Sequence, residues 1–472
     1  MSSSLPPLLP DATRDLAAFS ASLRFEDLPA DVVARIKTSV LDSLGCCLFG
    51  ATLPWTQKVA ALAQQEGARE TSSLIGYGRR SSASLAALVN GVAGHAFELD
   101  DIHKESIVHA GSIATPVAIA LAERKGRTSG AELITAMVAG YEVGHRVGSA
   151  ATMSLFFRGF HPQGTSGVFV AAATAARMLG LDAHHFQHAL GIAGSQAGGL
   201  MAAQEGAMVK RFHCGRAAQS GIYCADLAKD GFTGITDVLE AAYGGFLSSY
   251  SDEPNASRLT NDLGTRWETL DVGYKPHASV TSIHSALDSL KAIMEEQHLT
   301  ADDVARVEAG LSPMTHVHCA WEYKAQGVTA AQMNLYYGLA VIAEDGMAFT
   351  EQFQEHRLAE PRLLDFISRI EARVDPEIEA MGAAFRHASR LRLTARDGRV
   401  FERLALHRRG SPENPISHEA IEDKFRAVVA PCMSRADAQR IVDTVNRLEA
   451  LDSIEPLIDL ISVDLVHAGS RD

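Results

Sequence analysis

The stretch GTSGVFVAAATAARML, residues 164–179, indicates the class of fold. Apolar and small residues cover nearly its whole helical circumference, which is typical of a helix that is buried on all sides. Alanine and glycine are frequent, and such small residues allow neighbouring helices to pack closely. The stretch therefore predicts a compact bundle of buried helices.

Further helical segments lie on the N-terminal side of this stretch. Their apolar residues recur at helical spacing, and several are rich in alanine and glycine. The predicted helices cover residues 27–49, 82–101, 114–123 and 129–150. We therefore expect the first half of the chain to be all helical.

The pattern changes near residue 271. Segments of alternating polarity appear, and Asp397-Gly398 is a typical hairpin turn between two of them. We expect a smaller α/β (α+β) domain over residues 271–411, and a large all-helical domain built from residues 1–270 and 412–472. The predicted strands cover residues 304–311, 369–375, 390–394 and 400–406, and the predicted helices of this domain cover 282–296 and 329–344.

The bulk composition argues against several classes of protein. The net charge of −14 over 472 residues disfavours a nucleic-acid partner. None of the six cysteines forms a C-x-x-C pair, so the spacing predicts neither a zinc site nor an iron–sulfur cluster. The first residues do not resemble a signal peptide, and no run of about 18 apolar residues occurs. We therefore expect a cytoplasmic protein with no membrane partner.

The densest group of titratable residues is HAFELDDIHKESIVHAGS, residues 95–112. Helical spacing predicts that His95 and Glu98 share one face, and that a loop follows from His103 to Ser112. A loop that leads into a helix N-terminus can hold a substrate carboxylate. Charges between apolar helices favour a functional site here over a solvated helix end.

A metal site is an alternative interpretation of this segment. Glu98, Asp100, Asp101, His103 and His109 are residue types that suit a hard divalent cation, although no standard ligand spacing is present. The alternatives from other classes are therefore a metal-dependent hydrolase and a non-catalytic binding protein.

Four other segments carry candidate functional residues. His161 precedes Pro162 at a predicted helix entrance, where it could act as a general acid or base. Lys210 and Arg211 belong to a basic run that could bind carboxylates. Lys275 opens the smaller domain, and Tyr337 lies in an apolar helix where a core or interface position is the simpler interpretation.

The order and spacing of these motifs resemble the MmgE/PrpD family over nearly the whole chain. Each motif is weak alone, but their joint arrangement is specific. The motifs are Val40–Gly45, Glu98–Asp101 through Gly111, Phe160–Pro162, Val209–Gly215, Gly231–Gly234, and Lys275-Pro276 with His284 nine residues beyond Lys275.

The resemblance implies a helical domain made of both chain ends, with a lid between them and an active site between lid and helical domain. It also implies a homodimer that works without a metal or an organic cofactor on a small polycarboxylate. Glu98 and Ile102 occupy positions where the decarboxylase branch has Asp and Thr. The catalytic residues by resemblance are His109, His161, Lys210, Lys275 and Tyr337, and the substrate-binding candidates are Glu98, Asp100, Asp101, His103 and Arg211.

The expected chemistry is the removal of a proton from a carbon alpha to a carboxylate of a small di- or tricarboxylate. It requires positioned acids and bases, such as His109 and His161, and cations that stabilise the developing charge, such as Lys210 and Lys275. The family includes 2-methylcitrate dehydratase, cis-aconitate decarboxylase and iminodisuccinate epimerase. Since Ile102-His103 replaces the Thr-Trp of the first two, the sequence favours an isomerase or lyase of the epimerase type, with dehydratase and decarboxylase as alternatives.

Overall fold

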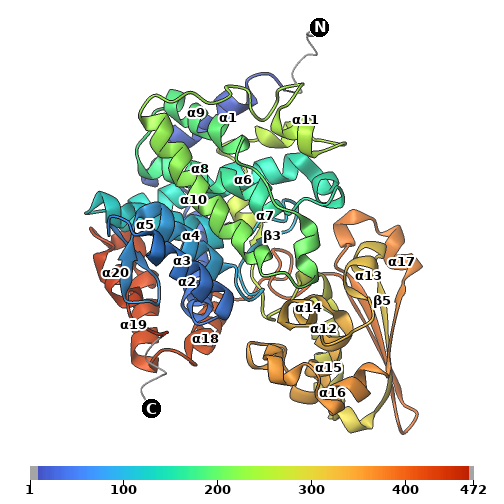
Figure 1. Ribbon diagram of the computed structural model, residues 1–472. Helices are drawn as coiled ribbons and strands as arrows, with labels where there is room; N and C mark the ends of the chain where they lie inside the picture. The colour runs from blue at the N-terminus through green and yellow to red at the C-terminus, as the bar shows by residue number, and fades with distance from the viewer. Residues whose placement is uncertain (1–8, 467–472) are drawn as a thin grey trace.

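The computed structural model describes residues 9–466, and its larger part is a bundle of helices (Figure 1). Every residue of α8 (Gly167–Met178) except Arg177 is buried, against α6 (Gly130–Phe157) and α10 (Val209–Lys229). A Cβ built on Gly221 of α10 would lie 2.3 Å from the Cβ of Ala171, so α8 and α10 cross too closely for any larger residue. The buried helix predicted from residues 164–179 is confirmed, with a separate first turn, α7 (Pro162–Thr165).

The remaining elements before residue 260 surround this centre. They are α1 (Ala12–Ser22), α2 (Ala30–Ala51), α3 (Pro54–Glu66), α4 (Ala83–Gly94), α5 (Gly111–Lys125), α9 (Ala183–Gly194), α11 (Phe246–Tyr250), and the strands β1 (Ser72–Leu74), β2 (Arg79–Ser81) and β3 (Ile102–His103). Within residues 9–466, no helix combines the length and the hydropathy needed to cross a membrane.

A smaller part, here called the lid region, contains a four-stranded sheet in the order β6-β5-β7-β8. β5 runs parallel to β6 and antiparallel to β7, and α12 packs on β7 and β8. Gly398 has a φ of 89° in the turn between β7 and β8, as the Asp-Gly pair predicts. The elements are β5 (Val304–Leu311), β6 (Ile370–Val374), β7 (Ser389–Ala395), β8 (Val400–Ala405), α12 (His284–Gln297), α13 (Pro313–Cys319), α14 (Val328–Met333), α15 (Leu335–Asp345), α16 (Pro361–Ile367) and α17 (Pro376–Ala380).

The C-terminal helices return to the larger part of the molecule. Figure 1 shows α18 (His418–Val429), α19 (Arg435–Asn446) and α20 (Glu455–Ile461) beside the N-terminal helices. Lys424 of α18 donates to the carbonyl of Leu99 at 2.5 Å and to the Asp42 carboxylate at 2.6 Å. The fold is therefore mainly α, with the lid region inserted between two helical chain ends.

One predicted helix is wrong at its C-terminal end. α4 ends at Gly94 instead of continuing to residue 101, because Glu98 adopts a φ of 55° that a right-handed helix cannot contain. β3 then pairs with β4 (Val272–Gly273) at the start of the lid region. His95 and Glu98 therefore do not share a helix face; contacts with other elements set their positions.

Candidate active site

Glu98 contacts three cations that come from two parts of the chain. Lys210 and Arg211 both contact Oε1, with Arg211 Nη1 at 2.5 Å, and Lys275 Nζ lies 3.1 Å from Oε2. Burial alone raises the pKa of the Glu98 carboxyl, but the three cations lower that pKa well below its usual value. Glu98 is therefore a fixed anion that positions these cations. Its left-handed backbone is the kind of local strain that collects at functional sites.

Lys210 and Arg211 lie in the first turn of α10. α10 begins at Val209, so the basic run belongs to the helix itself. Burial lowers the pKa of Lys210 to about 8, against the opposing effect of Glu98. An amine with this pKa is still mostly charged at neutral pH and can also give up a proton.

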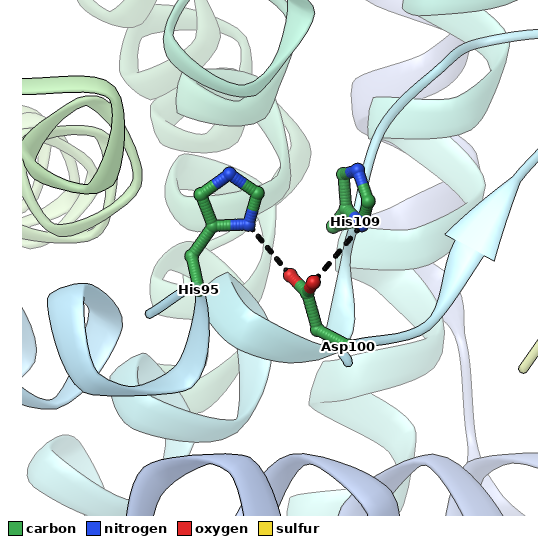
Figure 2. Close-up of side chains that lie close together, drawn as sticks. All are labelled: His95, Asp100 and His109. Carbon is green, nitrogen blue, oxygen red and sulfur yellow. Dashed lines mark hydrogen bonds and ion pairs between the residues drawn. The ribbon is translucent and has the colours of Figure 1, made fainter. Parts of the chain in front are cut away.

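Asp100 lies between two imidazole rings, and Figure 2 shows one of its oxygens facing each ring. Oδ2 is 2.7 Å from His95 Nδ1, and Oδ1 is 3.3 Å from His109 Nδ1. Lys275 Nζ lies 3.6 Å from the same Oδ1. We call His95, Asp100 and His109 the open cluster, because His109 lines a cavity.

The open cluster fixes which histidine nitrogen is available for chemistry. Burial lowers the pKa of His95 to about 4, although Asp100 opposes this, so His95 is neutral and donates Nδ1–H to Asp100. Burial raises the pKa of Asp100, but His109, His95 and Lys275 lower it, with the net result well below its usual value. An ionised Asp100 beside His109 Nδ1 leaves Nε2 as the ring nitrogen that can serve a substrate.

His161 forms a second acid–base pair at the entrance of α7. Its Nδ1 lies 2.9 Å from Nδ1 of His213, so one ring donates and the other accepts. Burial, together with the charge of Lys210, lowers the pKa of His161 well below its usual value. His161 is therefore a neutral histidine at neutral pH, held next to a cation.

A cavity of about 70 Å³ lies between the helical part and the lid region. It is lined by the predicted residues Glu98, His109, His161, Lys210 and Lys275. Its lining also includes groups that the sequence did not single out, which come mainly from the lid region: Lys104, Thr281, Ser282, His318, Arg386, His387 and Arg408.

The charges on the cavity wall are strongly unequal. Five cationic side chains line it, and Glu98 is the one carboxylate among the lining residues. Burial lowers the pKa of Arg408 to about 10, at which the guanidinium is still charged near neutral pH. In a protein of net charge −14, this local excess of positive charge produces a field that attracts anionic groups. The cations are Lys104, Lys210, Lys275, Arg386 and Arg408.

Five predicted site residues do not line the cavity: Asp100, placed above beside His109, and Tyr337, Asp101, Arg211 and His103. Tyr337 is fully buried in the lid core, and its hydroxyl donates to the carbonyl of Gln352 at 2.6 Å, away from the residues that line the cavity. Asp101 accepts from Gly111 N–H and from the hydroxyl of Tyr141, so it holds the start of α5. Arg211 stands behind Glu98 and also donates to the carbonyl of His95.

His103 is the fifth, and it belongs to a separate group that we call the sealed cluster: His103, His145 and Glu268. His103 Nε2 lies 3.0 Å from Glu268 Oε2, and its Nδ1 accepts from Ser106 N–H at 3.2 Å. The rings of His103 and His145 stack with centroids 4.4 Å apart. All three residues are buried, and none lines the cavity.

Three of the five metal ligands that the sequence suggested face other partners in the structure. Glu98 contacts cations, Asp101 accepts hydrogen bonds, and His103 faces Glu268. The ligand atoms of His95, Asp100 and His109 do lie within 4.8 Å of one another. However, the Lys275 ammonium lies beside the shared carboxylate, and its positive charge opposes the binding of a metal cation there.

Comparison with known proteins gives matches over both parts of the chain. Residues 14–259 match the MmgE/PrpD N-terminal domain, and residues 277–450 match the MmgE/PrpD C-terminal domain. The chain is 32% identical over 475 residues to a cis-aconitate decarboxylase-like protein, oryM, of Aspergillus oryzae, covering 96% of this chain and 98% of that protein.

Two further relatives are named cis-aconitate decarboxylases. The protein of Aspergillus terreus is 30% identical over 470 residues, which cover 95% of this chain and 96% of the relative. The human protein is 27% identical over 469 residues, which cover 96% and 95% respectively.

Proposed function

The chain belongs to the MmgE/PrpD family, and from this premise we propose that it is a lyase that decarboxylates a cis-aconitate-type tricarboxylate. The observation that carries the proposal is the cavity wall, with five cations and one carboxylate. A tricarboxylate has the charge that such a wall selects. The named relatives favour the decarboxylase over the epimerase type that Ile102-His103 alone suggested.

The cations would hold the carboxylates and stabilise the charge that develops. Glu98 positions Lys210 of α10 and also Lys275, which follows β4, and Arg386 and Arg408 come from the lid region. Fixed cations in a site that excludes bulk water stabilise a carbanion next to a carboxylate without reorganising. The same groups therefore bind substrate and lower the barrier.

The reaction balances with the groups of the open cluster. The C–C bond to one carboxyl group breaks and carbon dioxide leaves. Its electron pair forms a new terminal double bond, and the pair of the original double bond moves to the carbon alpha to another carboxylate. In our proposal His109 delivers the proton from Nε2 to that carbon, while Asp100 stabilises the charged ring.

The test is incubation of the purified protein with cis-aconitate in deuterium oxide, followed by proton and carbon NMR. We expect release of carbon dioxide and one solvent deuteron in the methylene group beside a carboxylate of the product. Iminodisuccinate and 2-methylcitrate serve as parallel substrates. Epimerisation of the first or dehydration of the second, with cis-aconitate untouched, would contradict the proposal.

A further inference from the structure

A second, larger cavity adjoins the charged one, and it is mainly apolar. It measures about 930 Å³ and lies between the end of α6, α13 and the segment around α17. Cavities that bind drug-sized ligands measure roughly 300–1,000 Å³. We call it the apolar annex; its apolar lining includes Met153, Phe157, Val317, Trp321 and Ile378.

The annex and the charged cavity are direct neighbours. Five residues line both of them: Phe156, Met314, His318, Met333 and Arg386. We call these five residues the junction, because a ligand held by Lys210 and Lys275 would have to pass them to reach the annex. Burial lowers the pKa of His318 to about 4, so this junction residue is neutral and compatible with an apolar group.

The junction also points to a carboxylate at the boundary between the two cavities. Arg386 is 5% exposed, and its Nε has no hydrogen-bond partner among residues 9–466. The other guanidinium nitrogens contact the Glu105 carboxylate and the carbonyls of Ala383 and Lys104. These contacts hold a positive charge at the boundary, where it attracts a ligand carboxylate.

We propose that the substrate is a polycarboxylate that carries an unbranched alkyl chain, with the carboxylates in the charged cavity and the chain in the apolar annex. The inference rests on the proposed function, because it places the reacting carboxylates in the same site. Phe157 and Val317 are 67% and 80% exposed, so apolar surface is left open where the chain would lie.

Calorimetric titration with succinate, butylsuccinate and octylsuccinate tests the proposal. Affinity is expected to rise about fourfold for each methylene that enters the annex, which corresponds to about 0.8 kcal/mol. Octanoate has the chain but a single carboxylate, so it should bind much more weakly than octylsuccinate. Equal affinities for succinate and octylsuccinate would overturn the proposal.

Two matched variants locate the chain. Phe157→Asp puts a charge in the annex and should reduce the affinity ratio of octylsuccinate to succinate by at least about tenfold, since a desolvated charge opposes an apolar chain. Phe232→Asp is the control, because Phe232 is 57% exposed and lines neither cavity. An unchanged ratio in Phe157→Asp overturns the proposal.

Sedimentation of the same variants separates this idea from an interface between two copies of the chain. If Phe157→Asp dissociates a dimer and leaves the ratio unchanged, the annex is an interface and the proposal is overturned. Turnover of cis-aconitate is measured separately. Decarboxylation without chain-length dependence contradicts this inference alone, and chain-length dependence without decarboxylation contradicts the proposed function alone.

Discussion

The open and sealed clusters use the same residue types for different purposes. In each, a buried carboxylate faces a histidine, as Asp100 faces His109 and Glu268 faces His103. Only the open cluster borders the charged cavity and a lysine, Lys275. The sealed cluster instead connects β3 to the segment just before β4. The surroundings of a histidine, more than the residue types next to it, therefore decide whether it can do chemistry.

The largest effect should separate the two histidines. His109→Gln removes the proposed proton donor, so we expect kcat to fall about 10³-fold, within the range known for general acids. His103→Gln should change kcat by less than about threefold and should lower the melting temperature, because Glu268 loses its buried partner. Steady-state rates and thermal melts of both variants measure this. Equal losses of kcat in the two variants would contradict the different roles assigned to His109 and His103.

The second prediction concerns the carboxylate of the sealed cluster. Burial raises the pKa of Glu268, but its partner His103 lowers it by more. The resulting pKa is about 2. A depressed folded-state pKa stabilises the fold above the unfolded pKa, and this stabilisation is lost as pH falls toward 2. Glu268→Gln should therefore lower the free energy of unfolding by up to about 3 kcal/mol at pH 7.

Denaturant unfolding of wild type and Glu268→Gln between pH 7 and pH 3 measures this difference. The gap should narrow as the pH falls below about 4.5, the usual range of a glutamate. Glu66→Gln is the control, because Glu66 is exposed at the end of α3. A gap that is constant with pH would show that the Glu268 carboxylate does not stabilise the fold through its charge.

The two clusters also show how far the sequence predicts the site. The order of the motifs predicted that five residues belong to one site, and the structure places all five around one cavity. They are Glu98, His109, His161, Lys210 and Lys275. The sequence of residues 95–112 did not show that His109 lines the cavity and His103 does not. Their difference depends on Glu268, a residue 165 positions beyond His103 that no local spacing connects to it.

The lid contribution to the cavity was missed for a similar reason. The alternating strands and the Asp-Gly hairpin were predictable, because they follow from local periodicity. Arg386 and Arg408 lie just outside that hairpin, before β7 and after β8, and in the sequence they look like ordinary surface arginines. Contacts with residues far away in the sequence hold them at the cavity: Arg386 donates to the carbonyl of Lys104, and Arg408 to the carbonyl of Tyr274.

The smallest predicted effect is a shift in the pH dependence of kcat/KM. It depends on Glu98, the carboxylate next to the open cluster. Lys210 has a pKa of about 8, and Glu98 raises that pKa against the effect of burial. If protonated Lys210 binds a substrate carboxylate, kcat/KM must fall as pH rises through about 8. In Glu98→Gln the raising charge is gone, so this basic limb should move to lower pH by roughly one unit. Glu268→Gln should leave the limb in place, since Glu268 lies in the sealed cluster. A limb that moves in both variants, or in neither, would remove the distinction between the two clusters.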